Sequence, residues 1–160
     1  MFAIVTDPID PRALRESILD PAAGGFCSFE GWVRNHHQGR AVLSLEYEAY
    51  RSLAEKEGTR IVHEARQKFE ILHARCHHRI GSLAIGELAV AVVVTAAHRD
   101  AAFDACRYII DEVKFRVPVW KKEHFADGTS GWVRCDHCHE AGHRHHHDHG
   151  HVHIHHPQHG

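Results

Sequence analysis

The sequence predicts an α+β domain, because stretches typical of strands and of helices alternate in an irregular order rather than as repeated strand–helix units. The chain has 160 residues, of which 43% are apolar and 25% charged, as in ordinary globular domains. The composition changes after residue 134, and residues 135–160 are rich in His and poor in large apolar residues. We therefore expect a folded domain over residues 1–134 and a disordered tail over residues 135–160.

The first predicted elements are a short strand and a helix. Phe2–Val5 is apolar and short, which favours a strand. Asp10 followed by Pro11 is a typical helix start, because Pro is well tolerated at the first helical position. Leu14 and Ile18 are four residues apart and share one face of this helix.

Two strands and a long helix are predicted next. Phe26–Val33 is rich in β-formers, Asn35–Gly39 is polar and predicts a turn, and Leu43–Ala49 alternates as a half-buried strand does. Ser52 and Glu55 have capping-box spacing and predict a helix that begins at Ser52 and ends near residue 69. Its expected buried face consists of Ala54, Gly58, Ile61, Ala65 and Phe69.

The second half of the domain predicts a central strand and a second long helix. Ile71–Ile80 is a strand candidate, and the continuous apolar run Leu88–Thr95 predicts a strand buried on both faces. His98–Lys114 is helical in pattern and ends before Pro118, which disfavours helix at the preceding residue. The expected inward residues of this helix are Ala102, Cys106, Ile109 and Val113. The expected last elements are an extended Val117–Phe125 and a short strand Gly131–Arg134.

Charge and hydropathy exclude several classes of function. Residues 1–134 hold 18 basic and 18 acidic residues, which argues against a nucleic-acid-binding surface. The apolar run that begins at Leu88 is far shorter than the ~20 residues of a membrane helix, and the N-terminus has no signal pattern. We therefore expect no nucleic-acid or membrane partner and a cytoplasmic location. Cys27, Cys76 and Cys106 are interpreted as small buried hydrophobes.

Two polar clusters are candidate anion sites. The first spans residues 34–40, with Arg34 and Arg40 at its ends. The alternative interpretation of this segment is a solvated loop without a binding role. The second is His98-Arg99 at a helix start, where cations oppose the helix dipole unless an anion binds there. The alternative is that both side chains are simply exposed.

A third cluster contains the lysines Lys114, Lys121 and Lys122. Side chains alternate along a strand, so Lys121 and Lys122 face opposite sides and only one of them can share a pocket with Lys114. A lysine among other cations suits proton transfer or nucleophilic chemistry, although surface lysines are the commoner case.

The motifs that surround these clusters occur in a specific order. They are Gly31-Trp32-Val33-Arg34-Asn35-His36, Leu45-Glu46-Tyr47-Glu48-Ala49-Tyr50, His78-Arg79-Ile80-Gly81, Thr95-Ala96-Ala97-His98-Arg99-Asp100-Ala101-Ala102-Phe103, then Asp111, Lys114, Arg116, Pro118, Trp120, Lys121 and Glu123, and Gly131-Trp132-Val133. In this order, across residues 1–134, they resemble the catalytic (large) subunit of molybdopterin synthase, the MoaE family. His37 and Arg51-Ser52-Leu53 depart from the usual family pattern, which weakens only what the resemblance implies about local loop shape.

The resemblance implies an α/β hammerhead fold with a largely antiparallel sheet, and a sulfurtransferase of molybdenum cofactor biosynthesis. The implied reaction converts cyclic pyranopterin monophosphate (precursor Z) into molybdopterin. The implied sulfur donor is the thiocarboxylate on the C-terminal Gly-Gly of a small ubiquitin-like subunit. The implied assembly is a homodimer with one small subunit at each end, a heterotetramer, in which residues of both large chains contribute to each pocket. No cofactor is implied for catalysis.

The same resemblance implies the site residues. Lys114 and Lys121 correspond to the essential lysines, which we expect to polarise the acyl or ketone oxygen and to transfer protons. Arg34, His98 and Arg99 suit the substrate phosphate. The full expected substrate-binding set is Trp32, Val33, Arg34, His98, Arg99, Lys114, Lys121, Lys122 and Glu123.

The tail suggests metal chemistry that is separate from this reaction. Cys135, Cys138 and His139 match the C-x-x-C-H pattern of haem attachment, but the chain has no export signal, so we favour a divalent metal. With twelve histidines in the tail, we expect loose binding of several Ni, Zn or Cu ions. The histidines are interrupted, which favours a native extension over an expression tag. Two alternatives stay open, namely a passive tail and a metal-handling protein whose folded body is only a scaffold.

Overall fold

The computed structural model describes residues 1–134, and the predicted metal ligands Cys135, Cys138 and His139 lie outside this range. The elements, in chain order, are β1 Phe2–Val5, α1 Pro11–Glu16, β2 Gly25–Trp32, β3 His36–His37, β4 Arg40–Ala49, α2 Arg51–Lys68, β5 Ile71–Arg79, β6 Gly81–Ala84, β7 Leu88–Ala96, α3 Arg99–Arg116, β8 Val119–Phe125 and β9 Ser130–Arg134. They confirm the predicted α+β class, because strands and helices alternate irregularly and nearly all strand pairs are antiparallel.

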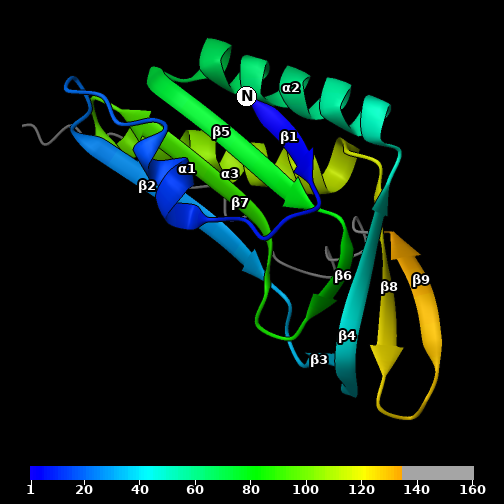
Figure 1. Ribbon diagram of the computed structural model, residues 1–160. Helices are drawn as coiled ribbons and strands as arrows, with labels where there is room; N and C mark the ends of the chain where they lie inside the picture. The colour runs from blue at the N-terminus through cyan, green and yellow to red at the C-terminus, as the bar shows by residue number, and fades with distance from the viewer. Residues whose placement is uncertain (135–160) are drawn as a thin grey trace, which may run out of the picture.

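The larger half of the described molecule is a sheet in the order β1-β5-β7-β2, with α2 and α3 on one face and α1 on the other (Figure 1). Strand β7 lies inside this sheet and is buried along its whole length. Val92 and Val94 point into the core under α2 and α3, whereas Ala91 and Val93 pack under α1. Because both faces of β7 are covered, its sequence is a continuous apolar run instead of an alternating one.

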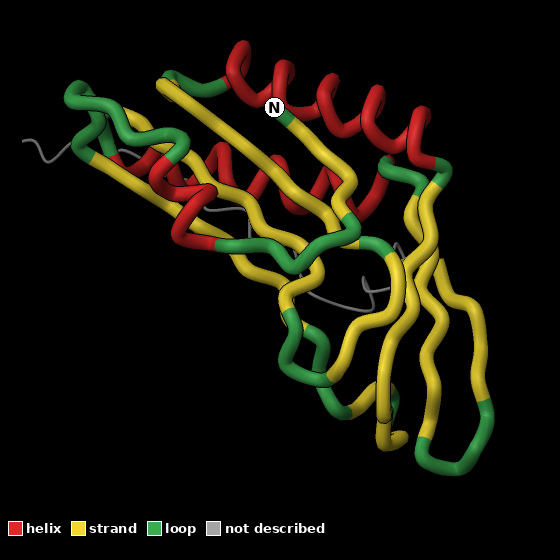
Figure 2. The backbone as a smooth tube through the Cα atoms, in the orientation of Figure 1, coloured by secondary structure: helices red, strands yellow, loops and turns green. Residues whose placement is uncertain are grey.

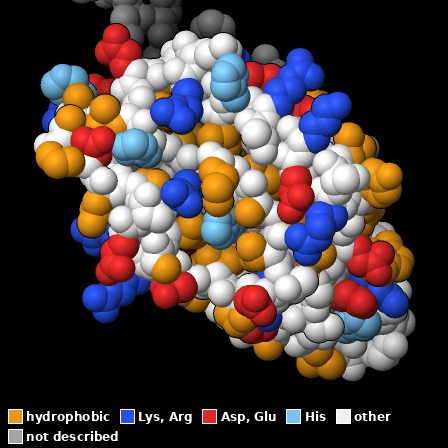
Figure 3. All heavy atoms as spheres, turned by 45° about the horizontal axis from the view of Figure 1, so that its top comes forward, with side chains coloured by type: hydrophobic (Ala, Val, Ile, Leu, Met, Phe, Trp, Pro, Cys, Tyr) orange, Lys and Arg blue, Asp and Glu red, His pale blue; other side chains and the backbone are white. Residues whose placement is uncertain are grey.

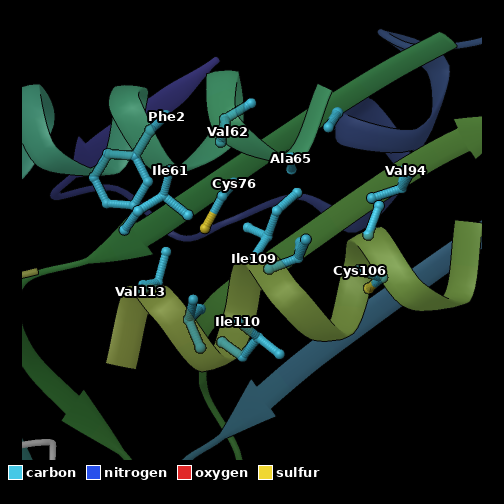
Figure 4. Close-up of a cluster of buried hydrophobic side chains, with 14 of the residues drawn as sticks. Phe2, Ile61, Val62, Ala65, Cys76, Val94, Cys106, Ile109, Ile110 and Val113 are labelled. Atoms are coloured by element: carbon cyan, nitrogen blue, oxygen red, sulfur yellow. The ribbon is translucent and has the colours of Figure 1, made fainter. Parts of the chain in front are cut away.

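The core under the two long helices contains the residues that the helical periodicity predicts. Ile61 of α2 and Ile109 of α3 are fully buried, and Phe2 of β1 belongs to the same cluster and lies against α2 (Figure 4). The expected inward residues of α3 are all buried, and those of α2 are buried except Phe69, which is partly buried. In residues 1–134, no helix combines the length and the apolar character needed to cross a membrane.

A second sheet, in the order β3-β4-β8-β9 with β6 also paired to β4, extends away from the helices (Figures 1 and 2). It has its own small core of Val33, Val42, Leu45, Leu83, Ala89 and Phe125. The chain enters this sheet at β3 and β4 and returns to it at β6. It returns again at β8, which follows α3 and Pro118. This return places the end of α3 beside the junction of the two sheets.

The structure corrects two local predictions and adds one strand. The predicted capping box at Ser52 is wrong, because α2 begins at Arg51 and its N-cap Tyr50 makes no side-chain capping bond. The predicted turn at residues 35–39 contains the short strand β3, and the chain reverses at Gln38 and Gly39, both with positive φ. Strand β6 was not predicted.

The C-terminal end of α3 is tied to α2 by one arginine. Arg116 binds Glu57, Glu64 and Glu112, at 2.6 Å from its Nη1 to Glu64 Oε2 and 3.0 Å to Glu112 Oε2. The hydrogen bond from Arg116 lowers the pKa of Glu64 to about 2. The network fixes the end of α3, which is the part of the helix that carries Lys114.

We predict that Gly58→Ala destabilises the domain. A Cβ at Gly58 would lie 2.2 Å from the ring of Phe2, which is itself buried. Overpacking costs ~1–3 kcal/mol, against ~1 kcal/mol gained from helix propensity. The free energy of unfolding, measured in urea, should therefore fall by up to about 2 kcal/mol. The control Ser52→Ala in the same helix should change it by less than ~0.5 kcal/mol. A Gly58→Ala variant with a free energy of unfolding equal to or above that of the wild type would contradict this packing.

We also predict that Arg116→Gln makes the free energy of unfolding depend less steeply on pH in the acidic range. The pKa of Glu64 is about 2 in the folded state and 4.5 for an unperturbed glutamate, so the unfolded chain binds more protons between these pH values. The resulting stability is present above pH 4.5 and is lost as the pH falls toward 2. The free energy of unfolding, measured in urea at several pH values across this range, should change less with pH for Arg116→Gln than for the control Arg60→Gln. The arginine of the control is mostly exposed. Parallel slopes in the two variants would refute the assignment.

Candidate active site

A polar cavity of about 440 Å³ lies where the two sheets meet the C-terminal end of α3. Strand β2 and the chain after it supply Trp32 and Arg34, β4 supplies Tyr47, α3 supplies Lys114, and β8 supplies Lys121. Its full lining is Phe29, Glu30, Gly31, Trp32, Arg34, His36, Val42, Leu45, Tyr47, Lys114, Lys121 and Glu123. The structure therefore brings five predicted site residues together: Trp32, Arg34, Lys114, Lys121 and Glu123.

Lys114 and Lys121 converge because the chain reverses between them. Pro118 follows the end of α3, and β8 runs back from there along β4. Along β8 the burial alternates, with Val119, Lys121, Glu123 and Phe125 inward. The sequence-based prediction that Lys121 and Lys122 face opposite sides is therefore correct.

The inward face of β8 carries a buried ion pair. Lys121 Nζ lies 2.9 Å from Glu123 Oε1, and the two side chains are only 10% and 3% exposed. Burying two charges is costly unless they are paired, and here two side chains of opposite charge lie in contact at the wall of the cavity. In residues 1–134, Glu123 Oε2 has no hydrogen-bond partner.

A smaller cavity of about 70 Å³ adjoins the first and shares Gly31, Trp32, Tyr47 and Lys114 with it. His78 of β5 lines this inner cavity, donates from Nδ1 to the carbonyl oxygen of Arg79 at 2.9 Å, and packs its ring against Tyr47. Burial and, to a smaller extent, the nearby Lys114 charge lower the pKa of His78 to about 4. His78 is therefore neutral near pH 7 and adds no second charge beside Lys114.

Four predicted substrate-binding residues lie elsewhere in the single chain. Val33 is buried in the core of the second sheet, and Lys122 stands over the Trp132 ring on the outer face of β8. His98 and Arg99 are exposed at the start of α3. Fifteen helical residues separate Arg99 from Lys114, or about 22 Å at the helical rise, so these cations do not reach the cavity of their own chain.

The lining residues absent from the predicted set include Tyr47, His36 and His78. Tyr47 pairs with Lys121 across β4 and β8, and only this strand register places it at the cavity. His36 reaches the cavity because β3 pairs with β4. Although the tyrosine and both histidines belong to quoted motifs, no spacing rule identifies them without the sheet pairing.

The arrangement suits an anionic substrate and proton transfer to oxygen. Arg34 can bind a phosphate in bidentate fashion, and the two ammonium groups can donate to a developing oxyanion. The face drawn in Figure 3 carries acidic and basic side chains side by side, so this face has no continuous cationic surface. In residues 1–134, no three His, Cys, Asp or Glu side chains converge into a metal site.

Comparison with known proteins gives consistent matches. The family model described as MoaE protein matches residues 4–116. A "Molybdopterin synthase catalytic subunit" of Thermoplasma volcanium is 43% identical over 129 residues, which cover 81% of this chain and 94% of that protein. A crystal structure of molybdopterin synthase from Staphylococcus aureus superposes with a TM-score of 0.78 at 38% identity, covering 82% of this chain and 96% of that chain. On this evidence the chain belongs to the MoaE family.

Proposed function

We propose that this chain is the catalytic subunit of a molybdopterin synthase, which converts cyclic pyranopterin monophosphate into molybdopterin. The observation that carries the proposal is the cavity that joins Arg34, Lys114 and Lys121 in one chain. Relatives named molybdopterin synthase catalytic subunit place the chain in molybdenum cofactor biosynthesis, as a sulfurtransferase. The metal-handling alternative is not favoured, because the folded body belongs to a family of enzymes.

The cavity side chains divide the work by their chemistry. Arg34 is exposed at the cavity and binds the phosphate of the substrate. The ammonium groups of Lys114 and Lys121 donate hydrogen bonds to the acyl or ketone oxygen as negative charge develops there, and one of them transfers a proton to it. The sulfur comes from the thiocarboxylate of a small ubiquitin-like partner subunit, so neither the buried Cys76 nor Cys106 is needed as a sulfur donor.

A second copy of the chain completes the site in this proposal. His98 and Arg99 lie outside the cavity of their own chain and are exposed. They stand at the N-terminus of α3, where an anion can bind. In a homodimer that brings the start of one α3 to the end of the other, these two cations join Arg34 around the substrate phosphate. The assembly with one small subunit on each large subunit is the proposed heterotetramer.

We predict that both cavity lysines are needed for the reaction. Lys114→Ala and Lys121→Ala should each lower kcat by about 10²–10⁴, the usual contribution of a positioned proton donor. Lys122→Ala, on the outer face of β8, should be much milder. The assay supplies the cyclic pyranopterin monophosphate and the thiocarboxylated partner and detects molybdopterin as its fluorescent oxidation product. Full activity in a Lys114 or Lys121 variant would remove that lysine from the mechanism.

A mixing experiment tests the shared site. Lys114→Ala chains and Arg99→Ala chains should each be nearly inactive as homodimers. After subunit exchange, the mixed dimers contain one intact cavity, so part of the activity should return. If Arg99 serves the cavity of its own chain, mixing restores nothing, and if it serves no cavity, the Arg99→Ala homodimer is already active.

We also propose that residues 135–160 bind divalent metal ions without taking part in sulfur transfer. Cysteine thiolates and imidazoles are ligands that Ni, Zn and Cu ions prefer. Calorimetry should detect several weak sites for Ni²⁺ or Zn²⁺ in the full chain and none in a chain ending at Arg134. Removing metal with a chelator should leave the rate of product formation unchanged. A chelator-sensitive rate would connect the tail to catalysis and contradict this separation.

A further inference from the structure

Two buried polar atoms beside the cavity lack a hydrogen-bond partner in residues 1–134: Nδ1 of His37 and Oε2 of Glu123. They belong to side chains that nearly touch, because His37 Nδ1 lies 3.4 Å from Glu123 Oε1. Unpartnered polar atoms are rare in protein interiors, so a pair of them in adjacent side chains needs an explanation. This Nδ1–Oε1 distance is only a few tenths of an ångström longer than a usual N–H···O hydrogen bond.

The position of His37 connects it to the cavity in two ways. Glu123 holds Lys121 at 2.9 Å, so any group that fixes the Glu123 carboxylate also fixes the Lys121 ammonium. His37 also follows His36 in the two-residue strand β3, and His36 lines the cavity. His37 is therefore joined to the cavity both through Glu123 and through its chain neighbour His36.

We propose that His37 is a positioning residue for Lys121 and acts through Glu123. This role rests on the proposed function of the cavity. When the cavity is occupied, the Nδ1–H of His37 donates to the Glu123 carboxylate, and the His37–Glu123–Lys121 chain of contacts holds the ammonium toward the substrate. Hydrogen bonds of this kind are often long in unoccupied sites and shorten when the substrate binds.

The proposal requires one particular protonation pattern on the His37 ring. A hydrogen must reside on Nδ1, either in the neutral Nδ1–H form or in the imidazolium form, because only then does the atom donate to a carboxylate. The other neutral form would place a nitrogen lone pair against a carboxylate oxygen. This requirement can be observed directly and without an activity measurement.

Kinetics of three variants test the role. His37→Leu should lower kcat about ten- to a hundredfold, the usual effect of losing a hydrogen bond to a charged group, with little change in KM. His37→Asn should recover most of the rate, because its amide N–H takes the place of Nδ1–H. The matched control is His124→Leu, which removes the histidine of another His–Glu pair, 3.8 Å from Glu46. That pair lies on the opposite face of β8, so kcat should not change.

The kinetic outcomes are decisive for variants whose thermal unfolding midpoint shows that they are folded as the wild type is. Wild-type kcat in His37→Leu would overturn the proposal, and so would an Asn variant as slow as the Leu variant. If the wild-type chain makes no molybdopterin, the proposed function fails, and the ring of His37 still provides a separate test.

That separate test is ¹⁵N NMR of the histidine rings in the full chain, with His37 assigned by its absence in His37→Asn. The expected result is a hydrogen on Nδ1 of His37 near pH 7. A ring that carries its hydrogen on Nε2 alone would overturn the proposal whatever the activity of the enzyme.

Discussion

The buried ion pair between Lys121 and Glu123 is the interaction around which the site is organised. Replacing such a pair by apolar residues often stabilises a protein, so its presence in the interior is poor evidence for stability. It lies on the inward face of β8, where the alternation of the strand would otherwise place apolar side chains such as Val119 and Phe125. The charge is therefore kept at a cost in desolvation, and the adjacent cavity gives it a use.

The fold could be predicted well wherever periodicity and burial coincide. The apolar run of β7 gave a central strand because α1 and the two long helices cover both of its faces. Pro118 correctly marked the end of α3. Local signals without tertiary support failed, since Ser52 has capping-box spacing although α2 already begins at Arg51. Strand β6 is short and exists only because it pairs with β4, a contact no local pattern encodes.

The candidate site was predictable to the extent that it follows from the family resemblance and from strand alternation. Alternation alone separated Lys121 from Lys122, and the structure agrees. His98 and Arg99 entered the predicted set through the family resemblance, which implies residues of both chains at each pocket, and within one chain Arg99 lies about 22 Å along α3 from Lys114. Tyr47 and His78 were missed as contributors because only the sheet register and the inner cavity bring them to Lys114.

The central claim is that the cavity at the junction of the two sheets binds the anionic pterin substrate. Calorimetric titration of the full chain with cyclic pyranopterin monophosphate tests this most directly, because it needs no partner subunit. The account predicts saturable binding that weakens with salt and falls at least about tenfold in Arg34→Gln, the loss expected for a charge-assisted hydrogen bond. Lys122→Gln should bind as the wild type does. Equal binding by wild type and Arg34→Gln, or no binding by either, would contradict the account.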